Sequence, residues 1–323
     1  SGSDAGDRPW RIGELAMLCV TTPATEPRLT PAARVTSAIL DALKRGVRPW
    51  IRPWSVDTSL SLPLRANGLP YKGVNTIALW AHALERGFAS PYWLTFKQAQ
   101  ALKARVRKGE RGAFVVYYGE RLVRDEAAEE APEASARTQR ILRGYTVFCA
   151  DQVEGLPEEF YPSAPASAPL SEREAQLLQQ VERIPAIVRH GGNRAYYAPA
   201  SDAIHLPLRE SFAGSGSYLI TRLHESAHWT RASSRLDRDF GAKRFGDAGY
   251  ALEELVAELT AAIVGATLNV PGDHVEDHAG YIDSWLKVLE SQPSAFLSAA
   301  GKAQQACDYL LQFIDAPPPE PPG

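Results

Sequence analysis

Sulfur-containing residues are scarce in this 323-residue chain, which has one methionine and three cysteines. Cys19, Cys149 and Cys307 are far apart and odd in number, so they provide neither a disulfide framework nor paired metal-binding cysteines. No apolar run approaches the roughly 20 residues that span a bilayer, and no basic segment followed by an apolar one begins the sequence. These absences exclude a disulfide-stabilised scaffold and a membrane-spanning protein. We therefore expect a protein of the reducing cytoplasm with no membrane partner.

Acidic and basic residues nearly balance over the whole chain, but they are unevenly distributed. The formal net charge is -3, with 45% hydrophobic and 23% charged residues, which is typical of a globular chain of about two domains. Residues 30–124 contain 16 Lys and Arg against 5 Asp and Glu, whereas the remainder contains 19 against 33. The basic segment predicts a polyanionic partner for that part of the molecule.

The hydrophobic pattern predicts a small α+β domain over residues 24–160. An amphipathic helix is expected from Pro31, because apolar residues recur there at helical spacing. Residues 113–118 and 144–149 are rich in β-branched and aromatic residues and predict two strands. The acidic, alanine-rich residues 125–136 between them favour a solvated loop, so the two strands are expected to form a hairpin.

A second α+β domain is expected over residues 171–315. Residues 161–170 are rich in Pro, Ala and Ser and predict a linker between the domains. Beyond this linker, a few strands precede several helices, which is typical of the α+β class. The proline-rich residues 316–323 predict a disordered tail.

A metal-binding motif lies in residues 219–230, which read LITRLHESAHWT. On a helix, His224 and His228 lie on one face, where both imidazoles reach a single ion, and Glu225 lies about 100° around the axis. This is the HExxH arrangement of zinc peptidases, in which the carboxylate takes a proton from the attacking water. The sequence therefore predicts Zn²⁺ bound by two histidines, with Glu225 as the general base.

The third ligand is expected in the helix that follows. Glu254 and Glu258 lie opposite an apolar stripe, among small residues, and no Lys or Arg occurs between residues 244 and 287. A solvated helix face normally pairs its acids with cations, so this face is expected to contact a second element. We assign Glu254 as the third ligand and Glu258 as a residue that orients a ligand histidine, with Glu258 or Glu253 as alternative ligands.

The sequence leaves open which divalent ion binds and whether a second histidine pair has a role. A His/His/Glu set also suits Mn²⁺ or another divalent ion. His274 and His278 are four residues apart as well, but without a nearby third ligand we interpret them as surface or helix-start residues. Tyr250 or His278 could hold an oxyanion during peptide hydrolysis.

Aromatic and cationic residues alternate in the basic segment. Flat rings beside cations favour single-stranded nucleic acid, because base stacking contributes about 1–3 kcal/mol per base without sequence recognition. The alternative is that the rings form the core and the cations only increase solubility, which we prefer for Trp80 but not for Trp50 and Trp54. The predicted DNA-binding residues are Arg48, Trp50, Arg52, Trp54, Arg65, Tyr71, Lys72, Asn75, Lys97, Lys108 and Arg111.

Several motifs, in a fixed order, resemble those of the ArdC-type antirestriction proteins of conjugative plasmids. They include NGxPYxGxN at 67–75, SPYWLTFKQ at 90–98, VRKGE at 106–110, the HExxHW segment, SRLxRD at 234–239 and EELVAE at 253–258. The resemblance covers about residues 30–312. It implies a single-stranded-DNA-binding domain joined to a zincin-like metallopeptidase domain in a bacterial cytoplasm, acting when plasmid DNA enters a recipient cell.

Two functions follow from this resemblance. In one, a DNA-guided zinc peptidase cleaves a protein substrate on or near single-stranded DNA. In the other, the protein coats and shields single strands, and its metal site is structural and proteolytically inactive. The resemblance also supports His224, His228 and Glu254 as ligands and Glu225 as the base, whereas the charged flanks Arg222 and Arg231 differ from those usual around HExxH in zinc peptidases.

Overall fold

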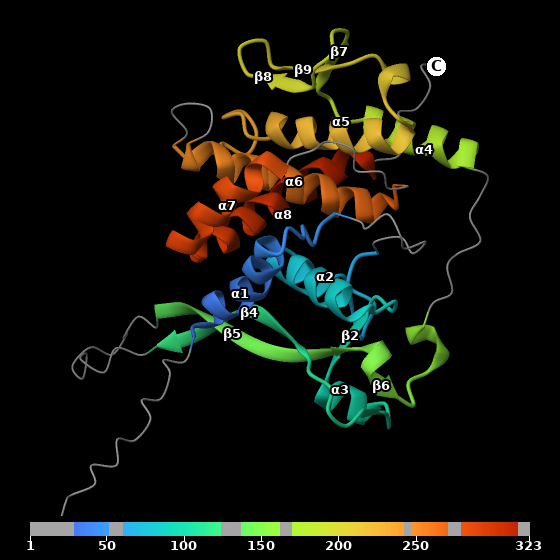
Figure 1. Cartoon of the computed structure of the whole chain (residues 1–323), viewed down its shortest axis with the longest axis vertical. Helices are drawn as coiled ribbons and strands as arrows, with labels where there is room; N and C mark the ends of the chain where they lie inside the picture. The colour runs from blue at the N-terminus through green and yellow to red at the C-terminus, as the bar shows by residue number, and fades with distance from the viewer. Residues whose placement is uncertain are drawn as a thin grey trace, which may run out of the picture.

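A computed structural model describes residues 29–51, 61–123, 137–161, 170–241, 247–270 and 279–315. Figure 1 shows the N-terminal half, in blue and green, against the C-terminal half, in yellow to red. The predicted acidic loop and proline-rich tail and nearly all of the predicted linker lie outside the described residues, as do Arg52, Trp54, His274 and His278. Within the described part of the chain, no helix is both long and apolar enough to cross a membrane.

A four-stranded sheet in the order β1-β2-β5-β4 organises the N-terminal half. The predicted hairpin is confirmed, because β4 and β5 pair antiparallel from Ala113 opposite Val147 to Val123 opposite Arg137. The elements here are α1 (Pro31–Lys44), β1 (Leu64–Arg65), α2 (Val74–Arg86), β2 (Tyr92–Thr95), α3 (Phe96–Ala101), β3 (Arg105–Val106), β4 (Ala113–Val123), β5 (Arg137–Cys149), η1 (Ala150–Gln152), β6 (Val153–Glu154) and η2 (Glu158–Phe160).

Helix α1 begins at Pro31, as predicted, and local sequence signals set this start. The Thr30 hydroxyl accepts a hydrogen bond from the Ala33 backbone N–H at 3.2 Å, and Pro31 occupies the first turn, where no intrahelical donor is needed. Val35 and Ile39 lie on its buried face. This face carries α1 onto both the sheet and the C-terminal helices (Figure 1).

The C-terminal half consists of a small sheet in the order β7-β9-β8 and a group of long helices. Figure 1 shows this sheet lying above α5, and α5 lying above α6. The α+β class predicted from the sequence is therefore confirmed. The elements are α4 (Leu170–Glu182), β7 (Ile187–His190), β8 (Tyr196–Ala198), β9 (Ala203–Leu206), η3 (Arg209–Ser211), α5 (Ser215–Trp229), α6 (Ala248–Leu268), α7 (Ala279–Ser291) and α8 (Ser294–Ile314).

One of the hydrophobic clusters among the described residues spans the two halves. Buried residues of α1 and α2 belong to the same cluster as those of α5, α6, α7 and α8. Trp50 enters this cluster from the N-terminal half, with its ring 5.8 Å from Trp285 and 6.5 Å from Phe296. Helices α7 and α8 therefore pack against α1 of the basic half, and Trp50 contacts α6 through a hydrogen bond to Glu258.

Candidate functional site

Helix α5 presents the two predicted histidine ligands on one face. His224 and His228 are one turn apart, and their Nε2 atoms are 3.2 Å from each other. Both side chains are largely buried, because the rest of α5 packs under the small sheet and against α6. The local geometry predicted from the HExxH spacing is the one the structure has.

Helix α6 brings a carboxylate to the same point. Glu254 has one oxygen 3.5 Å from the His224 Nε2 atom and the other 3.5 Å from the His228 Nε2 atom. The two helices approach closely at Gly265, where a Cβ atom would lie 2.6 Å from the Cδ1 atom of Ile220. A larger residue at position 265 would force the Ile220 side chain to move.

The donor set fits a divalent ion. One ligand atom from each of His224, His228 and Glu254 lies within 4.8 Å of the others. A tetrahedral ion with ligand bonds of about 2.0–2.1 Å separates its donor atoms by about 3.3–3.4 Å. The 3.2 Å between the two Nε2 atoms is close to this value, as is the 3.5 Å from each Nε2 atom to its nearer Glu254 oxygen, which is a different oxygen for each histidine. Two imidazoles and one carboxylate leave a fourth position open, which is the pattern of a catalytic site.

A buried carboxylate supports the site from behind. Glu253 accepts a hydrogen bond from the Nδ1 atom of His228 at 3.2 Å, and Arg238 donates to both of its oxygens at 2.8 Å. Such a contact fixes the orientation of the imidazole, with Nε2 directed at the ion. Sequence reasoning weighed Glu253 only as a ligand and missed Arg238, whose only signal was its place in the SRLxRD motif.

Glu258 lies on α6, one turn beyond Glu254. Its carboxylate is fully buried and accepts a hydrogen bond from the Trp50 indole N–H at 3.2 Å. The carboxylate that accepts a hydrogen bond from His228 is therefore that of Glu253. The role predicted for Glu258, orienting a ligand histidine, stays a prediction.

The charges at the centre shift one another's protonation. Burial opposes the charged form of His228, but hydrogen bonds to Glu253 and Glu254 outweigh it and raise the pKa of this imidazole to about 10. Burial likewise opposes the charge on Glu254, and its contacts with the two histidines hold its pKa well below the usual range. Without an ion, a proton on His228 balances these carboxylates.

Tyr250 and Glu225 complete the neighbourhood. Burial, a hydrogen bond with Tyr281 and the nearby Glu254 charge keep the pKa of Tyr250 well above its ordinary value, so its hydroxyl stays a donor. Glu225 is buried on α5 beside His228, whose pKa its charge helps to raise. The Glu225 carboxylate therefore lies near His228, and the Tyr250 hydroxyl lies near Glu254.

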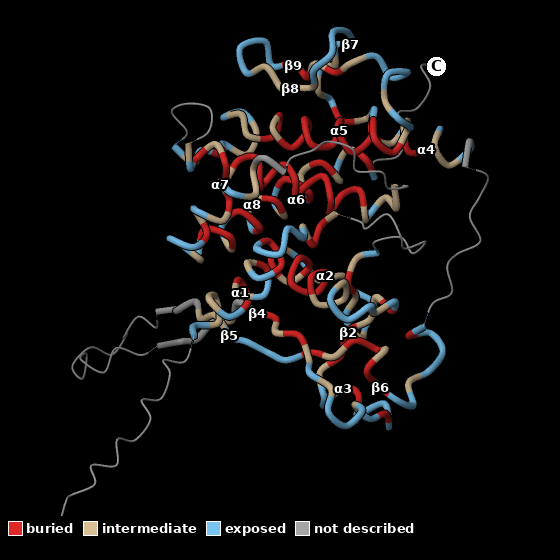
Figure 2. Tube along the Cα trace, in the orientation of Figure 1, coloured by how far each residue is buried: buried red, intermediate tan, exposed pale blue. Residues whose placement is uncertain are grey.

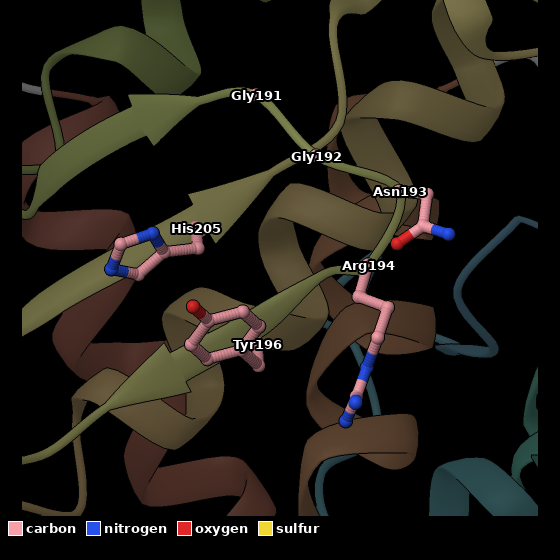
Figure 3. A pocket seen from close by; sticks show the side chains of 6 residues that line it. All are labelled: Gly191, Gly192, Asn193, Arg194, Tyr196 and His205. Carbon is pink, nitrogen blue, oxygen red and sulfur yellow. The ribbon is translucent and has the colours of Figure 1, made fainter.

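A separate hollow lies on the small sheet of the C-terminal half. Its cavity volume is about 360 Å³, and Figure 3 shows the side chains that surround it. His205 and Tyr196 stack there with ring centroids 4.7 Å apart. The residues lining it, which do not include the three clustered ligands, are Gly191, Gly192, Asn193, Arg194, Tyr196 and His205.

The structure corrects the prediction that Trp50 is exposed for base stacking. Trp50 is 2% exposed and packs in the shared core, and Arg48 beside it is half-buried. The large Trp50 ring occupies an apolar site between the two halves of the molecule. The prediction that Trp50 stacks on bases is therefore wrong. Arg52 and Trp54 lie outside the described residues.

Three other predicted DNA-binding residues make structural contacts. The amide of Asn75 donates to the Val116 carbonyl and accepts from its N–H, both at 2.8 Å, which closes the outer edge of β4. Lys72 forms an ion pair with Asp308 at 3.1 Å across the two halves. Tyr71 packs on the sheet with the guanidinium of Arg65 5.5 Å above its ring.

The remaining predicted cations lie on the surface of the N-terminal half. Lys97, Lys108 and Arg111 are exposed, as is Arg65. Exposed rings occur as well, at Phe96, Tyr117 and Tyr145. Tyr145 was missed from the sequence, because it lies in a strand whose alternation does not reveal how far the neighbouring strand covers it.

Comparison with known proteins matches each half separately. Residues 30–148 match the model of the N-terminal domain of the anti-restriction factor ArdC, and residues 175–302 match that of a zincin-like metallopeptidase. The uncharacterized protein y4eC of Sinorhizobium fredii is 41% identical over 252 residues, 76% of this chain and 79% of that protein. DNA primase TraC of Escherichia coli is 38% identical over 273 residues, which are 78% of this chain but 24% of the primase.

Solved structures share the whole arrangement. The metal-free structure of the antirestriction protein ArdC from plasmid R388 is 35% identical, with a TM-score of 0.73 over 88% of this chain and 97% of that one. Its Mn(II)-bound structure gives 34% identity and a TM-score of 0.71, over 88% and 98% of the two chains. The predicted two-domain architecture with a zincin-like domain is thereby confirmed. This chain belongs to the ArdC family of antirestriction proteins.

Proposed function

We propose that this antirestriction protein binds single-stranded DNA without sequence preference and carries a metal-dependent peptidase site that acts on a protein on or near that DNA. The observation that carries the proposal is the convergence of His224, His228 and Glu254 at ligand distances, with Glu225 beside them. The basic N-terminal half supports the DNA partner. Protection of incoming plasmid DNA would be the outcome.

The residues of the centre suit amide hydrolysis. A bound divalent ion supplies Lewis acidity, which polarises a scissile carbonyl and lowers the pKa of water to about 7. Glu225 is placed to accept the proton of the attacking water and later to pass it to the departing amine. Tyr250 keeps its proton and can donate a hydrogen bond to the oxygen that gains negative charge.

Zn²⁺ is the ion we propose for this centre, with Mn²⁺ as the alternative. The His/His/Glu donors and their close approach suit Zn²⁺. The manganese-bound relative supports a site that accepts more than one divalent ion.

A second function, DNA coating with a structural metal, is favoured by one observation. His224 is 4% exposed and Glu254 is 7% exposed, so little of the donor set reaches solvent. In this case the ion would stabilise the packing of α5 on α6, and catalysis would contribute nothing to protection.

The variant Glu225→Gln separates the two functions. We expect it to keep its metal and its affinity for an oligo-dT strand, but to lose cleavage of fluorescent casein measured with that strand present. Loss of antirestriction by this variant in conjugation assays supports the peptidase. Full protection by Glu225→Gln, together with no casein cleavage by the wild type, would establish the coating function instead.

A further inference from the structure

Two exposed tyrosines share one face of the N-terminal sheet. Tyr117 of β4 is 59% exposed and Tyr145 of β5 is 44% exposed. The register places Tyr117 opposite Arg143 and Tyr145 opposite Val115, so the two tyrosines are diagonal cross-strand neighbours on one face. The backbones of such neighbours are typically about 7–8 Å apart, which is within reach of aromatic side chains. Val115 on this face is buried, whereas Tyr117 and Tyr145 are exposed.

The strand beneath these rings is unusually open. Strand β2 pairs with β5 only as far as Thr95 opposite Val147, so residues 143–146 have no neighbour on that side among the described strands. All four of these residues are exposed, and Figure 2 shows this stretch of β5 in pale blue. Phe96, also exposed, directly follows Thr95 and so lies beside this open edge.

Cations accompany the rings. Arg143 and Lys97 are exposed, and neither has an acidic partner within 4.0 Å among the residues that the structure describes. Over the sequence of β2 through β4 and of β5, residues 92–123 and 137–149, there are ten Lys and Arg against two Glu. A positive surface with flat rings is complementary to a phosphate chain carrying unpaired bases.

We propose that Tyr117 and Tyr145 form a stacking surface for the bases of single-stranded DNA, with Arg143, which lies opposite Tyr117 on the same face, neutralising its phosphates. This inference rests on the proposed function and gives its DNA partner a location, on the sheet rather than on the segment around Trp50. Rings lying on a sheet can stack only on bases whose faces are free, and a duplex conceals those faces. The surface therefore selects single strands over duplexes without reading their sequence.

The test measures binding of a fluorescent oligo-dT strand to the full chain by anisotropy. We expect Tyr117→Ala with Tyr145→Ala to weaken binding about 30-fold or more, since each of the two stacked rings contributes about 1–3 kcal/mol. Tyr117→Phe with Tyr145→Phe keeps both rings and should bind within about threefold of the wild type. Tyr196→Ala is the matched control, because Tyr196 is also 44% exposed but lies in the other half, and it should bind as the wild type does.

Ultraviolet crosslinking of the wild type to oligo-dT needs no variant to fold. Trypsin then yields peptides 112–121, with Tyr117, and 144–173, with Tyr145, and we expect crosslinked thymine on these two. Crosslinks confined to other peptides, or unchanged binding by the double alanine variant, would overturn the stacking surface while leaving the proposed function intact. A wild type that fails to bind oligo-dT would instead overturn the DNA-binding function on which this inference rests.

Discussion

At the residue scale, a series of hydrogen bonds runs from Arg238 through Glu253 to His228, and composition alone does not reveal it. The side chains of Arg238 and Glu253 are almost fully buried, and their bidentate pairing holds the carboxylate in a fixed position. His228 therefore receives its orientation from a loop that follows α5 as well as from α6. Ligand geometry and folding stability depend on the same pair.

Glu253→Ala tests this dependence. We expect the affinity for Zn²⁺ to fall about 10- to 100-fold, because His228 loses the acceptor that orients it. We also expect the free energy of unfolding to fall by about 3–5 kcal/mol, because Arg238 is left buried without its carboxylate. Chelator competition measures the first quantity and urea denaturation the second.

A double variant separates the two effects. Glu253→Leu with Arg238→Met replaces the buried pair with apolar side chains of similar volume, which should recover much of the stability. Metal affinity should stay low, because His228 still lacks its acceptor. Recovery of both properties would mean that Glu253 acts on the site only through folding.

The raised pKa of His228 predicts how a bound ion changes stability with pH. In the metal-free protein its folded pKa is about 10, above the ordinary 6.5. The stabilisation from the protonated imidazole is therefore complete below about pH 6.5 and is lost as the pH rises toward 10. An ion replaces that proton, so the difference in Tm between metal-loaded and metal-free protein should widen from pH 6.5 to 9.5. A constant difference, followed by differential scanning fluorimetry, would contradict the proton release.

At the element scale, the sequence predicted the hairpin, α1 and the HExxH helix, because each has a strong local pattern. It predicted that the face of Glu254 contacts a second element, since small neighbours and missing cations indicated a buried face, and the structure brings Glu254 of α6 next to the two histidines of α5. The burial of Trp50 could not be predicted, because it depends on α7 and α8, which are more than 200 residues away in the sequence. Local patterns carry no information about such a long-range partner.

Gly144 shows how one position sets the packing of the long hairpin. A Cβ atom at Gly144 would lie 1.9 Å from the ring of Phe114, which lies across β5 at that point. We expect Gly144→Ala to lower the free energy of unfolding by about 1–3 kcal/mol, because the ring must move. Phe114→Leu in the same background should restore part of this loss, as measured by urea denaturation.

The matched control is Gly301→Ala. Gly301 lies in α8, and a Cβ atom there would meet nothing within 4 Å. Alanine should therefore stabilise the protein by roughly 0.5–1 kcal/mol through helix propensity alone. A destabilisation of similar size at both positions would show that the Phe114 contact is not the cause.

At the scale of the whole molecule, two regions that match separate families form one packed unit. Their shared core places Trp50, from the basic half, against the helix that supplies Glu254. Surface contacts such as the ion pair between Lys72 and Asp308 also cross the boundary, but both of its side chains are about half exposed. Exposed pairs contribute about 0–1 kcal/mol, so the buried contact should dominate the coupling of the halves.

Trp50→Ala tests whether the halves unfold together. Removing a buried tryptophan should lower the free energy of unfolding by about 3–5 kcal/mol, and Glu258 also loses a buried hydrogen-bond donor. Because the core is continuous, hydrogen exchange followed by mass spectrometry should accelerate in peptides of α2 and of α6 alike. Lys72→Ala, which removes only the exposed contact, should leave exchange nearly unchanged in both. Acceleration in α6 to α8 alone would mean that the basic half folds independently, and the DNA surface and the metal centre would then be joined only by the chain.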